Sequence, residues 1–186
     1  PVLSGKIMNI TVKPYESELC YCRPDTTWEK EGRDFYVPDG VEKVLWTPVV
    51  FARISKAGKC VGAKFVSRYY DGFGIGALLY CSDEDLAFSS CLDHTSLLPM
   101  PLYNPVVLDN KENEYTLGEL KGNLEGIKEA LEDAICKASR RISLRIGDLV
   151  AVELDVQKVL AERSSGETGF KAEFCGNPLF DLKVIF

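Results

Sequence analysis

The residues best suited to chemistry stand together in Cys91-Leu92-Asp93-His94, which brings a thiol, a carboxylate and an imidazole within four positions. His94 is the only histidine of the chain. A thiol beside an imidazole can act as a nucleophile–base pair, provided that the fold brings the two side chains into contact. Because the surrounding sequence is irregular, the alternative is that Cys91 and His94 lie at the surface or stabilise a loop.

Carboxylates form a second group of candidates. Asp83, Glu84 and Asp85 could bind a cation weakly, although such a run is also typical of a solvated acidic turn. Glu153 and Asp155 share one face of a predicted strand, because alternate strand residues point the same way. Together with the acidic turn, these two residues could in principle form a metal site.

Cysteine usage indicates the redox environment. The chain has seven cysteines, an odd number, at irregular spacing. Such a set is typical of reduced thiols, so we expect a cytoplasmic protein. Cys20 and Cys22 form one C-x-C pair, and without a second pair the sequence does not indicate a zinc site.

Overall composition restricts the possible partners. The 22 basic and 28 acidic residues give a net charge of -6, which argues against a nucleic-acid surface. No apolar run approaches the roughly 18 residues needed to cross a bilayer, so we expect no membrane partner. With 186 residues, 46% of them hydrophobic, the sequence suits a single domain over 1–186, in which 1–40 could form a partial N-terminal subregion.

Two apolar runs, Val44–Ile54 and Gly74–Cys81, dominate the middle of the chain. Their Val, Ile, Phe, Trp and Tyr content predicts strands. Neither run contains Asp, Glu or His, so a pocket built on them would have apolar walls. Pro48 lacks a backbone donor, which predicts that the first strand is at a sheet edge or bulged near that point.

The remaining elements complete an α+β pattern that is mainly β. Further strands are predicted at Lys6–Val12, Phe35–Pro38, Gly147–Leu154, Phe170–Cys175 and Leu179–Phe186, the last two forming a hairpin. One main amphipathic helix is predicted, because apolar residues recur every three or four positions from Leu117 to about Arg140. Thr116 and Glu119 fit a capping box, and glycines after it move the expected start towards Asn123.

In order along the chain, the sequence resembles the fumarylacetoacetate hydrolase (FAH) family, especially its short bacterial members. The matching segments are Lys6–Asn9, Glu18-Leu19, Gly32–Pro38, Val44–Ile54, Arg68-Tyr69-Tyr70, Gly74–Asp83, Gly147-Asp148-Leu149 and Phe170–Phe186. The resemblance implies the family's mixed β-sheet roll or barrel with one main helix. It also implies a homodimer, to which the edge-like strands lend support because such strands tend to be covered.

The resemblance does not extend to the family's functional residues. Thr47 and Val49 stand where the family has the Glu-x-Glu pair that binds Mg²⁺ or Mn²⁺, and Leu78 stands at the third carboxylate. That third carboxylate belongs to the family's Asp-Trp/Phe-Ser/Thr-Ala-Arg-Asp motif, of which only the last Asp is kept here, as Asp83. The family's general-base histidine is absent from the matching Lys13–Glu16 segment, and Val152–Asp155 does not match its Thr-Gly-Thr-Pro turn.

These differences favour a non-catalytic, metal-free protein of FAH fold with a binding or structural role, because apolar side chains cannot ligate a hard cation. Thr47, Val49, Leu78, Tyr80 and Asp83 would then line its pocket, without a catalytic residue, metal or cofactor. The alternative is a divergent hydrolase, decarboxylase or isomerase of small acylpyruvate-type oxo-acids, using Mg²⁺ or Mn²⁺ held by relocated ligands. A small apolar ligand in the same pocket is a third possibility.

Overall fold

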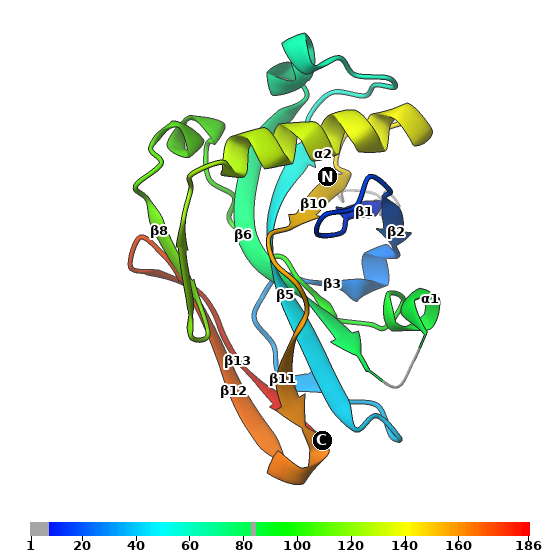
Figure 1. Ribbon diagram of the computed structural model, residues 1–186, viewed down its shortest axis with the longest axis vertical. Coiled ribbons are helices and arrows are strands. Elements are labelled where there is room, and N and C mark those ends of the chain that lie inside the picture. The colour runs from blue at the N-terminus through cyan, green and yellow to red at the C-terminus, as the bar shows by residue number, and fades with distance from the viewer. Residues whose placement is uncertain (1–7, 83–84) are drawn as a thin grey trace, which may run out of the picture.

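Of the 186 residues, the computed structural model describes residues 8–82 and 85–186 (Figure 1). The larger sheet contains β1 (Ile10–Lys13), β2 (Tyr21–Arg23), β3 (Trp28–Glu29), β5 (Lys43–Ile54), β6 (Tyr70–Cys81), β7 (Ser96–Leu97), β10 (Leu149–Glu153) and β11 (Lys158–Glu162). The smaller sheet contains β4 (Phe35–Tyr36), β8 (Glu114–Leu117), β9 (Leu120–Asn123), β12 (Glu167–Phe174) and β13 (Asn177–Ile185). The helices are α1 (Leu86–Ser89) and α2 (Ile127–Arg141), with 3-10 turns η1 (Asp25–Thr27), η2 (Ala63–Arg68), η3 (Pro105–Asp109) and η4 (Arg163–Ser165).

The two sheets pack against each other through aromatic side chains. The strand order is β2-β1-β10-β5-β6-β7-β3 in the larger sheet, with β11 also beside β5, and β4-β13-β12-β8-β9 in the smaller one. The rings of Trp46 on β5 and Phe170 on β12 meet edge to face, with centroids 4.9 Å apart. Phe73 on β6 and Phe174 on β12 meet in the same way at 6.2 Å. Such edge-to-face pairs add stability beyond the area they bury.

Helix α2 closes one end of this arrangement. Figure 1 shows it lying across the upper part of the larger sheet, and it packs against β10 and η2. Its apolar stripe, which includes Leu131, Ala134, Ile135 and Ala138, is fully buried. The predicted α+β class, mainly β with one main helix, is therefore confirmed. No helix in the described residues is both long and apolar enough to span a membrane.

Strand β5 is central in the larger sheet, so the prediction that Pro48 would put it at an edge is wrong. It pairs with β6 along one side. Along the other side, its residues Val49–Arg53 pair with β10 and its residues Lys43–Trp46 pair with β11. The Pro48 carbonyl accepts a hydrogen bond from Leu154 N–H at 2.9 Å. Since the N–H and C=O of one strand residue face the same neighbour, the missing donor faces the break between β10 and β11, where no ladder bond is lost.

The predicted start of the helix is also wrong. The proposed capping box, Thr116–Glu119, lies in the β8–β9 hairpin, whose turn is made by Gly118 and Glu119. Gly118 has φ of +57°, a left-handed conformation that two-residue hairpin turns require and glycine adopts readily. Helix α2 begins only at Ile127 and ends one residue beyond the predicted Arg140.

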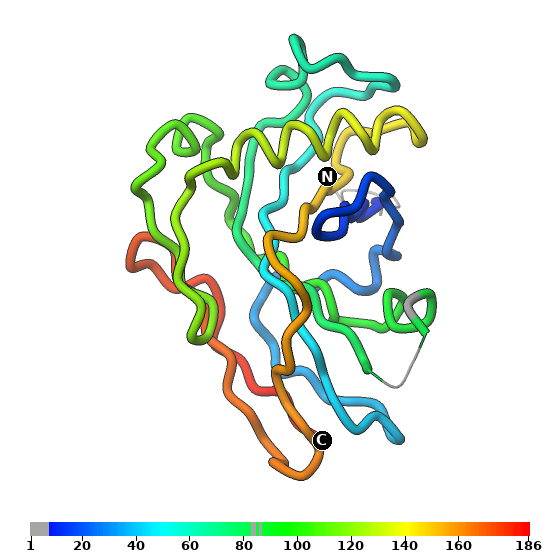
Figure 2. Tube along the Cα trace, in the orientation of Figure 1, coloured from blue at the N-terminus to red at the C-terminus, as the bar shows by residue number. Residues whose placement is uncertain are grey.

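The predicted closing hairpin is confirmed as the antiparallel pair β12 and β13, whose backbones lie side by side in Figure 2. The predicted first strand is found as β1, starting at Ile10; Lys6 and Ile7 lie outside the described residues. Strand β11 was not predicted from the sequence. Its Lys158–Glu162 segment pairs with β5 and has a register shift between Val159 and Ala161.

Candidate functional site

Five residues named from the sequence meet on one face of the larger sheet. Thr47 and Leu78 are direct partners across the β5–β6 ladder, and Val49 is the direct partner of Glu153 on β10. Tyr80 follows Leu78 by two positions on β6 and therefore shares its face. The topology thus brings Thr47, Val49, Leu78, Tyr80 and Glu153 together, although they are separated by up to about a hundred positions in the chain.

Most of this face is a packed apolar cluster. Val49 and Leu78 have no solvent exposure. They pack with apolar side chains from β1, β5, β10 and the segment after β7: Ile10, Val12, Phe51, Leu98, Leu149 and Ala151. The two positions that the resemblance equates with carboxylates are therefore occupied by apolar side chains in close-packed surroundings.

The polar groups on this face bond to one another. The Tyr80 hydroxyl donates to Oε1 of Glu153 and lies 2.6 Å from the Tyr21 hydroxyl. The other carboxylate oxygen, Oε2, accepts from the backbone N–H of Tyr15 at 3.0 Å. Burial raises the pKa of Tyr80 far above its ordinary value, so this phenol stays protonated and acts as a donor.

Arg23 supplies the buried positive charge beside this carboxylate. Its side chain is 1% exposed, and its guanidinium carbon lies 4.5 Å from the centre of the Tyr80 ring. Nε donates to the Tyr21 hydroxyl at 3.3 Å, Nη2 to the Leu79 carbonyl at 3.1 Å, and Nη1 to the Thr95 carbonyl and hydroxyl, both at 3.2 Å. Tyr21, Arg23, Tyr80 and Glu153, hereafter the buried network, thus link a cation to an anion through two phenols.

The polar atoms of the buried network are bonded within the protein. Each of its members uses its polar atoms on another part of the protein, as buried polar groups generally must. In the described residues, no fully buried side-chain nitrogen or oxygen lacks a hydrogen-bond partner. The network therefore stabilises the N-terminal strands against the central sheet.

Glu153 and Asp155 have different partners in the structure. The Asp155 carboxylate accepts from Lys158 Nζ at 2.6 Å, which lowers the pKa of Asp155. Its backbone carbonyl accepts from the Thr47 hydroxyl at 2.7 Å. Asp83 and Glu84 lie outside the described residues. Among the residues that the structure does describe, no group of three or more His, Cys, Asp or Glu side chains could hold a metal ion.

Cys91 and His94 both line a surface cavity of about 420 Å³, together with Asp34, Phe35, Tyr36 and Pro38. Nδ1 of His94 lies 3.4 Å from Oε2 of Glu29, whose side chain is only 4% exposed. A carboxylate in this position could orient an imidazole, as in nucleophile–base–acid arrangements. The structure thus places Cys91 and His94 on one cavity wall, with the imidazole beside a buried carboxylate.

Sequence reasoning missed two members of the buried network, Tyr21 and Arg23. The sequence from Arg23 to Gly32 is polar and turn-rich, which does not indicate a strand. One signal was available: Tyr21 and Arg23 alternate around Cys22 immediately before Pro24, the spacing of a short strand with one inward face.

Comparison of the sequence with protein-family models and with curated proteins finds no match. Among solved structures, the chain is similar to fumarylpyruvate hydrolase from Pseudomonas aeruginosa in complex with Mn²⁺ and pyruvate. The TM-score is 0.78, the sequence identity 12%, and the coverage 100% of this chain and 94% of that one.

Two other solved structures give a consistent result. A Yersinia pestis CO92 protein ascribed to the fumarylacetoacetate hydrolase family has TM-score 0.77 and 14% identity, covering 97% of this chain and 93% of its own. The 5-carboxymethyl-2-hydroxymuconate delta-isomerase from Mycobacterium smegmatis has TM-score 0.76 and 10% identity, with 96% and 79% coverage. Over nearly its whole length, the chain has the fold of fumarylacetoacetate hydrolase family proteins.

Proposed function

We propose that the chain is a metal-free protein of FAH fold with a binding or structural role rather than a catalytic one. The observation that carries the proposal is the packing of the sheet face described above. Val49 and Leu78 are fully buried among apolar side chains, and the carboxylate beside them, Glu153, is already bonded at both oxygens.

The chemistry of the donor set supports the proposal. Mg²⁺ and Mn²⁺ bind through several oxygen ligands, mostly carboxylates. On this face the described residues include one carboxylate, that of Glu153. The Thr47 hydroxyl already donates its hydrogen bond to the Asp155 carbonyl. These residues therefore do not suit a hard divalent cation. This donor set is therefore not suited to hold a metal ion that would polarise a dicarbonyl substrate.

A divergent enzyme is the competing proposal, and one observation favours it. Glu153 is the direct neighbour of Val49 on the adjacent strand, so a carboxylate stands beside a position that the resemblance equates with a ligand. A relocated site would need Glu153 to leave the Tyr80 hydroxyl and would need further acids. Its substrates would be small acylpyruvate-type oxo-acids, a class suggested by the fumarylpyruvate hydrolase to which the fold is similar.

Turnover separates the two proposals. The purified chain is incubated with an acylpyruvate, for example acetylpyruvate, and 1,3-diketone absorbance is followed with Mn²⁺ and with EDTA. We expect no loss of absorbance above the protein-free control in either case. Metal-dependent loss that disappears in Glu153→Gln would overturn the proposal and support the divergent enzyme.

A restoration variant tests the assignment of the ligand positions. Thr47→Glu, Val49→Glu and Leu78→Asp together place three carboxylates on adjacent strands of one face. Because like charges repel in a buried site, we expect this variant to melt below the wild type without metal and to gain stability with Mn²⁺. A folded variant that does not respond to Mn²⁺ would show that these positions are wrongly equated.

We further propose that the protein is cytoplasmic, as its cysteine usage indicates, and a homodimer, as the family resemblance implies. Light scattering at micromolar concentration tests the assembly directly. A clean monomer of about 21 kDa, the mass of one chain, would count against it.

A further inference from the structure

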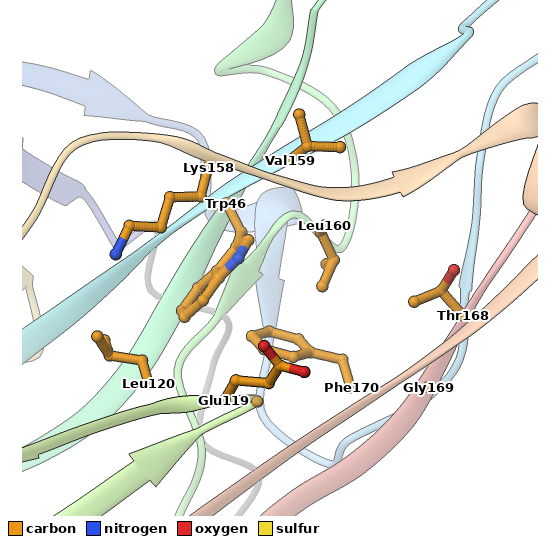
Figure 3. A pocket seen from close by; sticks show the side chains of 10 residues that line it. Trp46, Glu119, Leu120, Lys158, Val159, Leu160, Thr168, Gly169 and Phe170 are labelled. Atoms are coloured by element: carbon orange, nitrogen blue, oxygen red, sulfur yellow. The ribbon is translucent and has the colours of Figure 1, made fainter.

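A second cavity lies between the two sheets, on the other side of β5 from Val49. Its volume is about 470 Å³, within the range of small-molecule sites. Figure 3 shows Trp46 and Phe170 at its centre, with Leu120 and Leu160 on its walls. The cavity opens between β11, the turn of the β8–β9 hairpin and the start of β12, so it is bounded by three segments that are distant in sequence.

Within the described residues, the polar atom of Trp46 has no partner in the protein. The side chain is 7% exposed and packs edge to face on Phe170. In the described part of the chain the indole N–H has no hydrogen-bond partner. Every fully buried side-chain nitrogen or oxygen there does have a partner. The indole nitrogen must therefore keep an accessible surface, and Trp46 lines this cavity. A donor beside aromatic and aliphatic walls fixes the orientation of a ligand that carries an acceptor.

The charges at the rim do not favour an anion. Lys158 lines the cavity, but its ammonium is bonded to the Asp155 carboxylate at 2.6 Å. Glu119 adds a second carboxylate to the wall. The local balance is thus slightly negative, and a carboxylate ligand would be repelled.

We propose that this cavity binds a small, uncharged aromatic molecule that carries a carbonyl or comparable acceptor. The ring contacts Trp46 and Phe170, and the acceptor takes the hydrogen bond of the Trp46 indole N–H. Edge-to-face and offset contacts with two aromatic rings give such a ligand its affinity, and the N–H gives it its orientation. The site is separate from the buried network and does not depend on whether the protein is catalytic.

The two indole groups of the chain allow a direct test by ¹⁵N-labelled NMR. Trp28 Nε1 donates to the Leu98 carbonyl at 2.8 Å, so its resonance serves as an internal reference. On titration with acetophenone we expect the Trp46 indole resonance to shift saturably and that of Trp28 to stay in place. Ethylbenzene, which lacks the acceptor, should bind about five-fold more weakly, the worth of one hydrogen bond. Benzoate should bind at least about ten-fold more weakly.

Two variants of Thr168, whose side chain lies on the same face of β12 as Phe170, provide the matched control. Thr168→Phe fills the cavity and should abolish the shift, while Thr168→Val keeps the side-chain volume and should retain it. The spectrum of each variant also reports whether it is folded. The proposal is overturned if acetophenone moves neither resonance or both equally, or if benzoate binds as well. It is likewise overturned if folded Thr168→Phe still binds, or if the Trp46 resonance moves with protein concentration alone, since a second copy would then cover the cavity.

Discussion

The buried network makes a quantitative prediction for Tyr80→Phe. The substitution keeps the ring, which stacks near Arg23, and removes only the hydroxyl that donates to Glu153 and contacts Tyr21 at 2.6 Å. A hydrogen bond to a charged group contributes about 1.5–3 kcal/mol, and a buried group left without its partner costs a comparable amount. Because Glu153 keeps its bond from the Tyr15 N–H, we expect a loss of about 2–3 kcal/mol of unfolding free energy.

Urea unfolding followed by circular dichroism measures this loss. The midpoint should fall while the slope stays unchanged, since the area exposed on unfolding is the same. Tyr115→Phe is the matched control: Tyr115 is also buried, but its hydroxyl makes no hydrogen bond to another described residue. Its loss should cost no more than about 0.5 kcal/mol.

A double-mutant cycle identifies the partner. Combining Tyr80→Phe with Glu153→Gln should give a coupling energy above about 1 kcal/mol, because the two groups are in direct contact. The reasoning is refuted if Tyr80→Phe costs no more than Tyr115→Phe, or if the two changes are additive. The Glu153 carboxylate would then not depend on the network, and it could serve a relocated catalytic site.

Three further predictions follow from the packing and the charges of the larger sheet. In Gly76→Ala the new Cβ would lie 2.2 Å from the Leu97 carbonyl oxygen, so we expect a loss of about 3 kcal/mol of unfolding free energy, seen as a lower melting temperature. The control Gly169→Ala, whose new Cβ would meet no heavy atom within 4 Å, should be neutral. Arg23→Lys should cost about 3 kcal/mol in urea unfolding, since one ammonium cannot replace a buried guanidinium fork. Burial raises the folded-state pKa of Tyr80, so its contribution to stability is complete below about pH 10 and is lost as the pH rises further. Unfolding free energies measured from pH 8 to 11 should therefore fall more steeply for the wild type than for Tyr80→Phe, and equal slopes would contradict this.

Much of the fold could be predicted because its signals are local. The two long runs that became β5 and β6, the amphipathic face of α2 and the closing hairpin all depend on composition and periodicity within a few turns or strands. The edge position inferred from Pro48 failed because a proline cost depends on which neighbour faces the missing donor. At Pro48 the facing neighbour is Leu154, which is more than a hundred positions away in the chain and donates its N–H to the Pro48 carbonyl.

The site was predictable only in part for the same reason. The shared face of Thr47, Val49, Leu78 and Tyr80 follows from strand alternation and register. The capping box at Thr116 was mistaken because Gly118 turns the chain into a hairpin that pairs with β12, a strand some fifty positions later in the chain. Strand β11 was missed because the short Lys158–Glu162 segment gains its conformation from pairing with β5.

Tyr80 and Glu153 were named from the sequence, but the meeting of all four residues of the buried network could not be predicted. Its members come from β2, β6 and β10, and their hydrogen bonds join residues separated by 59 and 73 positions. No local pattern encodes the meeting of Arg23 and Glu153 through two tyrosines. Only the parallel pairing of β1 with β10 brings the N-terminal strands beside the strand that carries the carboxylate.

A metal titration tests the central claim most directly. Melting temperatures of EDTA-treated protein are measured with Mg²⁺ and Mn²⁺ up to millimolar concentration, with Glu153→Gln alongside. A cation at one hundred times its dissociation constant would add about 2.7 kcal/mol, or roughly 5–10 °C for a chain of this size. We predict no saturable rise. A saturable rise of that size that is lost in Glu153→Gln would mean that the sheet face holds a rebuilt metal site, and the metal-free account would be contradicted.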